Sequence, residues 1–247
     1  MISVRRSDPV PDPRHFIPYR QTVWRLVEAQ HRISTNRLAG STEDQETLEL
    51  VVDQAKPSLP VAARGLHYLL ATPFRYGYAK PSRFRRARQR PGIFYAAETI
   101  GTAIAETAYW RLLFFSRSPG FAPPSNVVEH SAFTVPLGIS RALDLTKPPF
   151  AKHAQAWMHP TDYGACQTFA DHARRIDAQL IRYASVRDPA HQANLALFDP
   201  AGFARKTPQI EQTWHFRYEA GVMTAFAALP SNVRYTFSRA QFGLDTH

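Results

Sequence analysis

A nearly uncharged helix is the feature of this sequence that most restricts its fold. Between residues 100 and 115 the chain carries only two charged side chains, Glu106 and Arg111. Thr99 precedes the segment and is a suitable N-cap residue, because its side-chain oxygen can accept a hydrogen bond from the first turn. A helix that is apolar around most of its circumference is normally buried. We therefore expect the rest of the chain to be built around residues 81–110, which include most of this helix and which could together form a site.

Glu106 is the residue of this helix that requires an explanation. A carboxylate in apolar surroundings loses hydration and needs a specific partner or a function. An ion pair with an arginine is the structural explanation, and a negative charge placed for catalysis is the functional one. A short apolar strand, predicted over residues 92–97, comes directly before the helix and is followed by Glu98, which is the rival carboxylate.

An arginine-rich loop comes before that strand. Arg83 is next to Phe84, an apolar anchor, and is the best candidate for a fixed guanidinium that grips a phosphate through paired hydrogen bonds. The alternative for most of these arginines is a solvated basic surface. No glycine-rich phosphate loop occurs in the chain, so a nucleotide would have to be held by side chains. The loop arginines are Arg83, Arg85, Arg86, Arg88 and Arg90.

Three uncharged polar residues are further candidates for binding. Tyr95 is either a core tyrosine with a satisfied hydroxyl or a ring that stacks on a flat cationic base. Ser185 ends a predicted strand in the sequence Tyr-Ala-Ser-Val-Arg and could form a hydrogen bond to a ribose. Asn194 precedes the apolar sequence Leu-Ala-Leu-Phe and is a weaker candidate.

The order of the predicted elements favours an α+β fold. Residues 1–14 are predicted to form a flexible N-terminal arm and residues 15–247 a single domain. The first seventy residues look largely helical, with one helix beginning near residue 41 and a second over about 60–70 that ends at Thr72-Pro73. A further helix is predicted over 161–176. Short strands are predicted over 131–135, 142–145, 179–186, 194–198, 212–219 and 233–238, and we expect them to form small sheets.

Composition excludes several classes of protein. The formal net charge is +10 and most of the basic residues are arginine, which favours forked recognition of phosphate or carboxylate groups. Cys166 is the single cysteine, so an internal disulfide and a multi-cysteine metal site are excluded. The ten histidines show no metal-ligand spacing, and we predict no metal. Cys166 could pair with a distant histidine as a nucleophile, but a buried small residue is the favoured explanation. No secretory signal or membrane span is predicted, and a cytoplasmic protein fits best.

Taken together, these motifs resemble the RES domain, a family named for its arginine, glutamate and serine. The resemblance covers roughly residues 23–203. Members of this family are commonly toxins of bacterial toxin–antitoxin pairs, and their fold resembles that of ADP-ribosyltransferases. They attack NAD+ by degrading it or by transferring ADP-ribose to a protein. The residues that carry the resemblance are Arg25 in VWRLV, Arg83 in SRF, Tyr95 and Glu106 in FYAAETIGTAIAE, Ser185 in IRYASVR, and NLALFDP at 194–200.

The resemblance implies a role for each candidate residue. Cleavage of the nicotinamide–ribose bond leaves an oxocarbenium-like ribose, which the carboxylate of Glu106 would stabilise. Tyr95 would stack on nicotinamide. NAD+ would be the substrate and no cofactor would be needed, while water, phosphate or a protein side chain could be the acceptor. Arg25 and Arg83 would hold the pyrophosphate, Ser185 and Asn194 would orient the ribose, and Arg85 would contribute to substrate binding.

The resemblance also implies a protein partner, an Xre-like helix-turn-helix antitoxin through which nucleic acid would be contacted. The helical segment at about 41–70 would be an insertion that shapes the pocket or contacts this antitoxin. Two other classes stay open at this point. A basic nucleic-acid-binding or nuclease module would bind in a strongly salt-dependent way and leave NAD+ intact, and a non-catalytic partner-binding protein would do neither.

Overall fold

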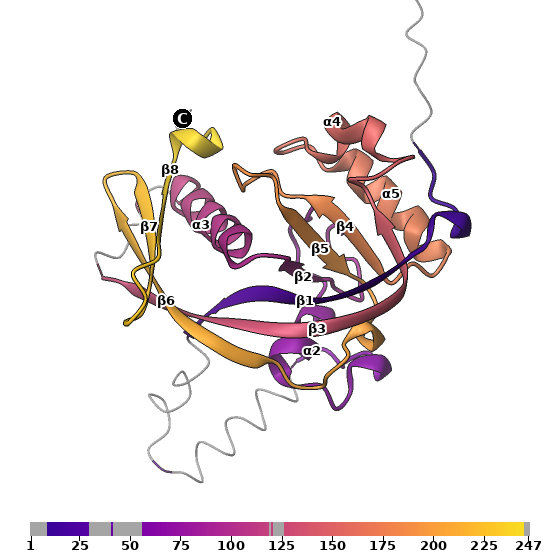
Figure 1. Ribbon diagram of the computed structural model, residues 1–247, viewed down its shortest axis with the longest axis horizontal. Coiled ribbons are helices and arrows are strands. Elements are labelled where there is room, and N and C mark those ends of the chain that lie inside the picture. Colours follow the sequence, from indigo (N-terminus) through magenta and orange to yellow (C-terminus); the bar gives the residue numbers. More distant parts are fainter. Residues whose placement is uncertain (1–8, 30–40, 42–55, 119, 121–125, 245–247) are drawn as a thin grey trace, which may run out of the picture.

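A closed ring of five strands organises the molecule (Figure 1). The computed structural model describes residues 9–29, 41, 56–118, 120 and 126–244. Eight strands in this part form one sheet in the order β1-β2-β5-β4-β3-β6-β7-β8, and an additional pairing of β1 with β3 closes the first five into a ring. The strands are β1 (Ile17–Glu28), β2 (Phe94–Ala97), β3 (Val128–Asp144), β4 (Leu180–Ala184), β5 (Ala193–Leu197), β6 (Gln209–Glu219), β7 (Val222–Ala227) and β8 (Arg234–Ser238).

Helices cover the sheet in separate places. The principal helices are α2 (Tyr68–Arg75), α3 (Ile100–Ser116), α4 (Ala154–Trp157) and α5 (Gly164–Arg175). In Figure 1, α3 lies between the ring and the extension formed by β6, β7 and β8, whereas α4 and α5 lie on the other side of β4. The apolar face of α3 packs against strands β6–β8 through Ile104, Ala108, Leu112, Trp214, Phe216, Met223, Ala225 and Phe237. The predicted burial of this helix is therefore confirmed, and so is the mixed α+β fold.

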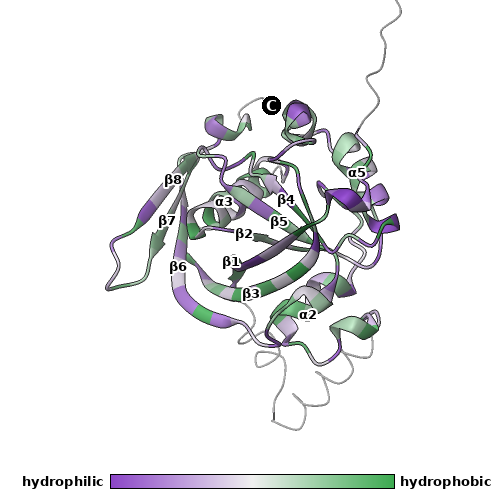
Figure 2. Cartoon of the chain, turned by 45° about the vertical axis from the view of Figure 1, so that its right-hand side comes forward, coloured by the Kyte–Doolittle hydropathy of each residue, from purple (hydrophilic) through white to green (hydrophobic). Residues whose placement is uncertain are grey.

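The long strand β3 connects the ring to the extension. Its first half pairs with β6, its last three residues pair with β4, and β1 runs along its other edge. Hydrophobic and hydrophilic residues alternate along it (Figure 2), as expected for a strand with unlike faces. Two short strands were expected here, at 131–135 and 142–145. Pro136 lies between them, where pairing with β6 has ended and pairing with β4 has not begun. Its carbonyl accepts a hydrogen bond from the backbone N–H of Ala204, and no strand needs a backbone N–H from it at this edge.

The N-terminal region differs from the prediction. Residues 17–28 form a strand rather than a helix, because they pair with β3 along almost their whole length and Val23 lies in the interior of the ring. The helix expected over 60–70 is replaced by a short 3-10 helix, Val61–Ala63, and by α2, which continues through Pro73 instead of ending before it. Residues 1–8 of the predicted arm, and residues 42–55 where the first helix was expected, lie outside the described residues. The strands also form one sheet rather than several small ones.

The interior of the ring is apolar except at one end. Its core is built by Tyr19, Val23, Phe94, Phe133, Val135, Leu180, Leu195 and Leu197, with Leu70 and Phe74 of α2 packed against them. Such a core stabilises the fold by removing apolar surface from water, by roughly 25 cal/mol for each Å². The polar end of the ring is held together in a different way.

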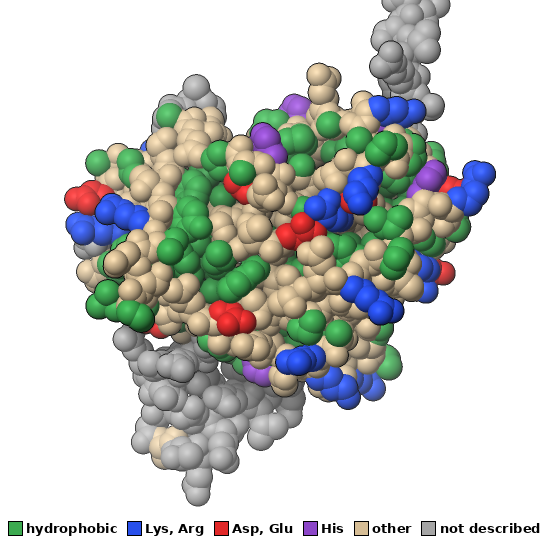
Figure 3. Space-filling view, in the orientation of Figure 1, with side chains coloured by type: hydrophobic (Ala, Val, Ile, Leu, Met, Phe, Trp, Pro, Cys, Tyr) green, Lys and Arg blue, Asp and Glu red, His purple; other side chains and the backbone are tan. Residues whose placement is uncertain are grey.

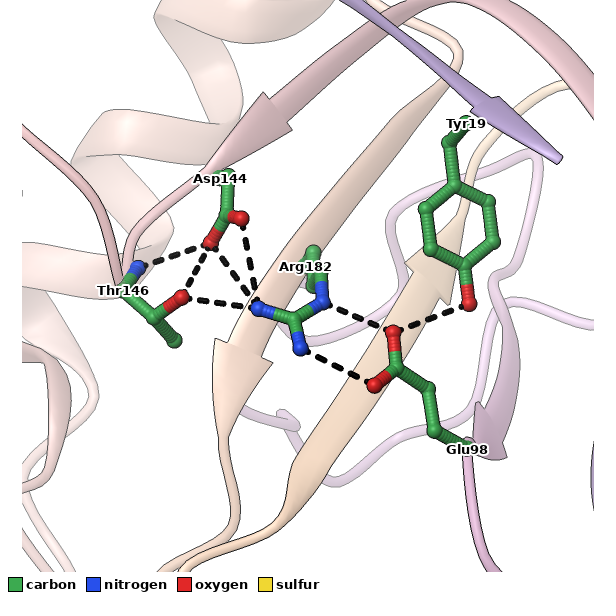
Figure 4. Close-up of polar contacts among 5 residues, drawn as sticks. All are labelled: Tyr19, Glu98, Asp144, Thr146 and Arg182. Carbon is green, nitrogen blue, oxygen red and sulfur yellow. Dashed lines mark hydrogen bonds and ion pairs between the residues drawn. The ribbon is translucent and has the colours of Figure 1, made fainter. Parts of the chain in front are cut away.

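A network of charged and polar side chains joins four strands at this end (Figure 4). Arg182 on β4 forms two hydrogen bonds to Glu98, which directly follows β2, at 2.7 and 2.9 Å. Its Nη1 donates to Asp144 at the end of β3 (3.2 Å) and to Thr146 (2.8 Å), and the hydroxyl of Tyr19 on β1 donates to Glu98 (3.1 Å). The hydrogen bond to Glu98 raises the pKa of Arg182 above its usual value. The guanidinium thus remains charged and links the strands.

Replacement of Arg182 by methionine should destabilise the protein. The substitution keeps the aliphatic stem but leaves Glu98 and Asp144, with side chains 15% and 4% exposed, without their cation. Loss of one partner of a largely buried ion pair costs on the order of 3 kcal/mol, which urea unfolding will measure. As a matched control, Arg217→Met breaks a pair with Glu219 in which both side chains are more than half exposed, and should cost less than about 1 kcal/mol. Equal losses in the two variants would contradict the role of Arg182.

Folding should also weaken at mildly acidic pH because of His130 on β3. This histidine is 2% exposed and packs against the ring of Phe216, and Arg111 and Glu28 are the charged groups nearby. Burial lowers its pKa from 6.5 to about 4, with a further lowering by Arg111. Between about pH 4 and pH 6.5 the unfolded chain therefore binds more protons than the folded chain. The contribution of His130 to the free energy of unfolding is fully present above about pH 6.5 and is lost as the pH falls towards 4.

The variant His130→Gln isolates this effect. The free energy of unfolding of the wild type should fall by about 2 kcal/mol more between pH 7 and pH 5 than that of the variant, because each pKa unit corresponds to about 1.4 kcal/mol. Denaturant titrations at the two pH values measure the difference. The same pH dependence in both proteins would show that His130 is not the group responsible.

Candidate active site

A cavity of about 590 Å³ lies where α3, β1, β2 and the arginine loop meet. Six of the seven predicted site residues line it, and the seventh, Ser185, contacts one of the six through a hydrogen bond. The six are Arg25, Arg83, Arg85, Tyr95, Glu106 and Asn194. Residues that are more than 150 positions apart in the sequence are thus brought to one cavity by the ring. Aromatic side chains form much of the remaining wall, namely Trp24, Tyr78, Tyr109, Trp110, Tyr163 and Tyr183.

Two donors hold one oxygen of Glu106. The hydroxyl of Ser185 donates to Oε1 at 2.7 Å, and Nδ2 of Asn194 donates to the same oxygen at 2.6 Å. Among the described residues, none donates to Oε2, so this oxygen is available to a ligand. The arginine partner considered as the structural explanation of Glu106 is not found in the described part of the chain. The side chain is oriented by neutral donors, which leave its charge uncompensated.

The direction of the Ser185 hydroxyl is fixed by the backbone. Its oxygen accepts hydrogen bonds from the backbone N–H groups of Arg187 (3.2 Å) and Asp188 (3.1 Å). Because a hydroxyl has one proton and two acceptor positions, the proton is left to point at Glu106. Ser185 is fully buried, and its contacts orient the carboxylate. Its expected contact with a ribose stays a prediction.

The loop that contains Ser185 is attached to the first turn of α3. Asp188 accepts a hydrogen bond from the hydroxyl of Thr102 at 2.7 Å, and Thr102 is in turn bonded to the N-cap residue Thr99 at 2.7 Å. Thr102 is fully buried and Asp188 is 9% exposed. A buried polar pair of this kind strongly favours one arrangement, because each group would be unsatisfied without the other. The helix that carries Glu106 and the loop that carries Ser185 are therefore held in register.

The arginine loop contains both fixed, buried arginines and solvated, exposed ones. Arg83 is buried, and its Nη1 donates to the backbone carbonyls of Trp157 (2.7 Å) and His159 (3.0 Å). Arg85 is also buried and donates three hydrogen bonds to carbonyls of its own loop, so less of its guanidinium is left for a ligand. The other three arginines of the loop are exposed, as expected for a solvated surface. They are Arg86, Arg88 and Arg90.

Tyr95 holds the arginine loop against β2. Its hydroxyl accepts a hydrogen bond from the backbone N–H of Phe84 (3.1 Å) and is bonded to Oγ of Ser82 (2.9 Å). Burial raises the pKa of Tyr95, so the hydroxyl is neutral at physiological pH. The hydroxyl is thus satisfied, as in the structural explanation, while the tyrosine still contributes to the cavity wall. Stacking of the ring on nicotinamide stays a prediction.

Arg25 approaches the cavity from β1. Its Nη1 donates to the backbone carbonyl of Tyr95 at 3.1 Å, and its guanidinium lies over the ring of Phe94 at 4.7 Å. Burial lowers the pKa of Arg25 to about 10, which still leaves it positively charged at pH 7. A cation that is this poorly hydrated would gain from an anionic ligand.

Sequence reasoning missed Arg187, which also lines the cavity. Its guanidinium stacks on the ring of Tyr109 at 3.5 Å and donates a hydrogen bond to the backbone carbonyl of Pro160. The residue lies in the same Tyr-Ala-Ser-Val-Arg motif as Ser185, and this proximity was the signal that could have identified it. Glu98, the rival carboxylate, does not line the cavity, because it faces Arg182 in the ring network.

The remaining candidates from the sequence lie elsewhere. Cys166 is fully buried in α5, and burial raises the pKa of its thiol, which is the opposite of what a nucleophilic cysteine needs. No group of three or more His, Cys, Asp and Glu residues in the described part of the chain is arranged to hold a metal ion. No described helix has the length and apolar character required to cross a membrane.

Comparisons with known proteins give a structural similarity and a family match. A search of curated proteins finds no match. Among solved structures, the chain is similar to one in the crystal structure of the M. tuberculosis MbcT–MbcA toxin–antitoxin complex, with 14% sequence identity and a TM-score of 0.47, over 81% of this chain and 86% of that chain.

The family model of the RES domain matches residues 59–219, which is more than half of the chain. All the predicted site residues except Arg25 lie within the matched range, and Arg25 precedes it. The resemblance recognised from the sequence motifs is thereby confirmed, and the chain belongs to the RES domain family.

Proposed function

We propose that this protein is an NAD+-consuming toxin that cleaves the bond between nicotinamide and ribose. The observation that carries the proposal is the environment of Glu106. One of its oxygens accepts hydrogen bonds from Ser185 and Asn194, no described residue donates to its other oxygen, and the arginines that line the cavity form no ion pair with a described residue. A site with several guanidinium groups and one carboxylate suits a substrate that carries phosphates at one end and a cation at the other.

The chemistry follows from the charge that the substrate develops. When the nicotinamide–ribose bond breaks, its electron pair leaves with the nicotinamide, which becomes neutral, and the positive charge moves to the ribose. The fixed carboxylate of Glu106 would stabilise this oxocarbenium-like ribose, because the attraction grows as the charge develops. An acceptor would then attack the ribose carbon and lose its proton. Water, phosphate and a protein side chain are the three candidates for this acceptor.

The remaining residues would bind and orient the substrate. Arg25 and Arg83 are positioned to hold the pyrophosphate, and the ring of Tyr95 could lie against the nicotinamide. Ser185 and Asn194 would act through Glu106, in addition to the ribose contacts implied by the resemblance. Arg85 would contribute less to substrate binding, since three backbone carbonyls already engage it.

Membership of the RES family also supports a role in a toxin–antitoxin pair. We propose that an Xre-like helix-turn-helix antitoxin neutralises the protein in the cytoplasm, and that nucleic acid is contacted only through this partner. The alternative of a nucleic-acid-binding module or nuclease is less well supported. On the face shown in Figure 3, the described Lys and Arg side chains are scattered among uncharged and hydrophobic ones, whereas binding to a phosphate backbone favours a continuous basic surface.

Replacement of Glu106 by glutamine tests the catalytic proposal. The amide oxygen can still accept from Ser185 and Asn194, so the fold should be kept while the negative charge is lost. We expect release of free nicotinamide from NAD+ to fall by about 100- to 1,000-fold, the usual effect of removing one group that stabilises transition-state charge. A chromatographic assay of nicotinamide, with thermal unfolding as a check of the fold, measures both quantities.

Glu98→Gln is the matched control, because Glu98 is the neighbouring carboxylate and lies outside the cavity. This variant should be less stable but should retain nicotinamide release at temperatures where it is folded. Undiminished release by Glu106→Gln, or an equal loss in the two variants, would refute the role of Glu106. Wild-type protein that leaves NAD+ intact but degrades RNA or DNA would favour the nuclease alternative.

A further inference from the structure

We propose that Arg187 is a diphosphate-binding residue of the cavity, and that the loop at 157–163 holds it for this purpose together with Arg83. The inference rests on the proposed function, in which the substrate is a dinucleotide. This loop begins at Trp157, the last residue of α4, and ends directly before α5. The carbonyls of Trp157 and His159 accept hydrogen bonds from Arg83, and the carbonyl of Pro160 accepts one from Arg187.

Aromatic rings complete the support of these two arginines. The guanidinium of Arg83 lies over the ring of Tyr163, at 4.8 Å, and that of Arg187 lies over the ring of Tyr109, at 3.5 Å. Each arginine is thus held by a carbonyl on one edge and a ring on one face. Arg187 is 6% exposed and Arg83 is 9% exposed, so neither is a freely moving surface side chain. A pre-positioned guanidinium loses little conformational entropy when it binds a ligand.

Both arginines keep donors for a ligand. A guanidinium has five N–H donors. Arg187 uses Nη2 for Pro160, and Arg83 uses Nη1 for its two carbonyls, so each retains at least one further nitrogen without a described acceptor. Arg85, by comparison, uses both terminal nitrogens. By this measure Arg187 is better suited than Arg85 to bind substrate.

The charge of the cavity indicates an anion with more than one negative charge. Its lining contains four guanidinium groups, those of Arg25, Arg83, Arg85 and Arg187, and one carboxylate, that of Glu106. None of the four arginines forms an ion pair with another described residue, although all line a partly closed cavity. Backbone carbonyls and rings orient such cations without neutralising them. A diphosphate, with several oxygens that match the arginine fork, supplies the missing charge.

Binding measurements with ADP and adenosine test this inference on the full-length chain. These ligands share the nucleoside and differ in the diphosphate, and neither requires cleavage of NAD+. We expect Arg187→Gln to weaken ADP binding by about 10- to 100-fold, as for the loss of a charge-assisted hydrogen bond, and to leave adenosine binding within about twofold. Arg187→Lys, which keeps the charge but not the fork, should lose about tenfold. Ligand-observed NMR covers the weak affinity of adenosine.

Arg234→Gln is the control, since Arg234 is an exposed residue of β8 that does not line the cavity, and its substitution removes the same charge. It should bind both ligands as the wild type does. Equal weakening of ADP and adenosine by Arg187→Gln would show that Arg187 only supports the fold, and this would overturn the inference. Unchanged ADP binding in that variant, or no ADP binding by the wild type, would overturn it as well.

The inference and the proposed function can fail separately. If the wild type binds ADP through Arg187 but releases no nicotinamide from NAD+, the diphosphate site stands and the proposed reaction falls. If the wild type releases nicotinamide and Arg187→Gln does so with unchanged kcat/KM, the reaction stands and the role of Arg187 falls.

Discussion

The hydrogen bonds from Ser185 and Asn194 to one oxygen of Glu106 connect the fold of this protein to its proposed chemistry. They join a buried helix, a loop and a strand of the ring at a single atom. Because the donors are neutral, they orient the carboxylate and leave its charge in place. An arginine partner would have neutralised that charge. The backbone N–H groups that fix the Ser185 hydroxyl, and the bond between Thr102 and Asp188, extend this control to the surrounding segments. The position of the other oxygen of Glu106, to which no described residue donates, is thus fixed by the protein before any ligand binds.

The arginines of the cavity are likewise oriented by uncharged groups, which leave their positive charge in place. The structure orients Arg25, Arg83 and Arg187 through backbone carbonyls and aromatic rings. Carbonyl dipoles and ring faces hold a guanidinium in place but do not neutralise it. Carboxylate partners would have neutralised these guanidinium groups and left them less able to bind a phosphate. The energetic cost of keeping like charges close together in the empty cavity is offset when an anion binds, and this is the reason to expect tight binding of a polyanionic substrate.

The sequence identified residues that the structure brings to one cavity, but it did not predict the topology of the sheet. The uncharged helix and its carboxylate were identifiable because one Glu in an apolar segment is unusual, and six of the seven candidates line one cavity. The closed ring could not be predicted, since β1 gains its stability from long-range pairing with β3 rather than from local propensity. Arg187 was missed for a related reason. The position of its guanidinium depends on Tyr109 and Pro160, which lie far from it in the sequence.

Two carboxylates at either end of one short segment show how the chain separates stability from chemistry. Glu98 and Glu106 both come from the stretch that was expected to hold the site, and composition alone could not rank them. Strand alternation directs Glu98 to the inside of the ring, where Arg182 and Tyr19 satisfy both of its oxygens. Helical geometry directs Glu106 to the cavity, where the described residues donate to only one of its oxygens. A carboxylate whose two oxygens both accept hydrogen bonds from the protein can stabilise a fold but has less to offer a substrate, so Glu106 is the better candidate for catalysis.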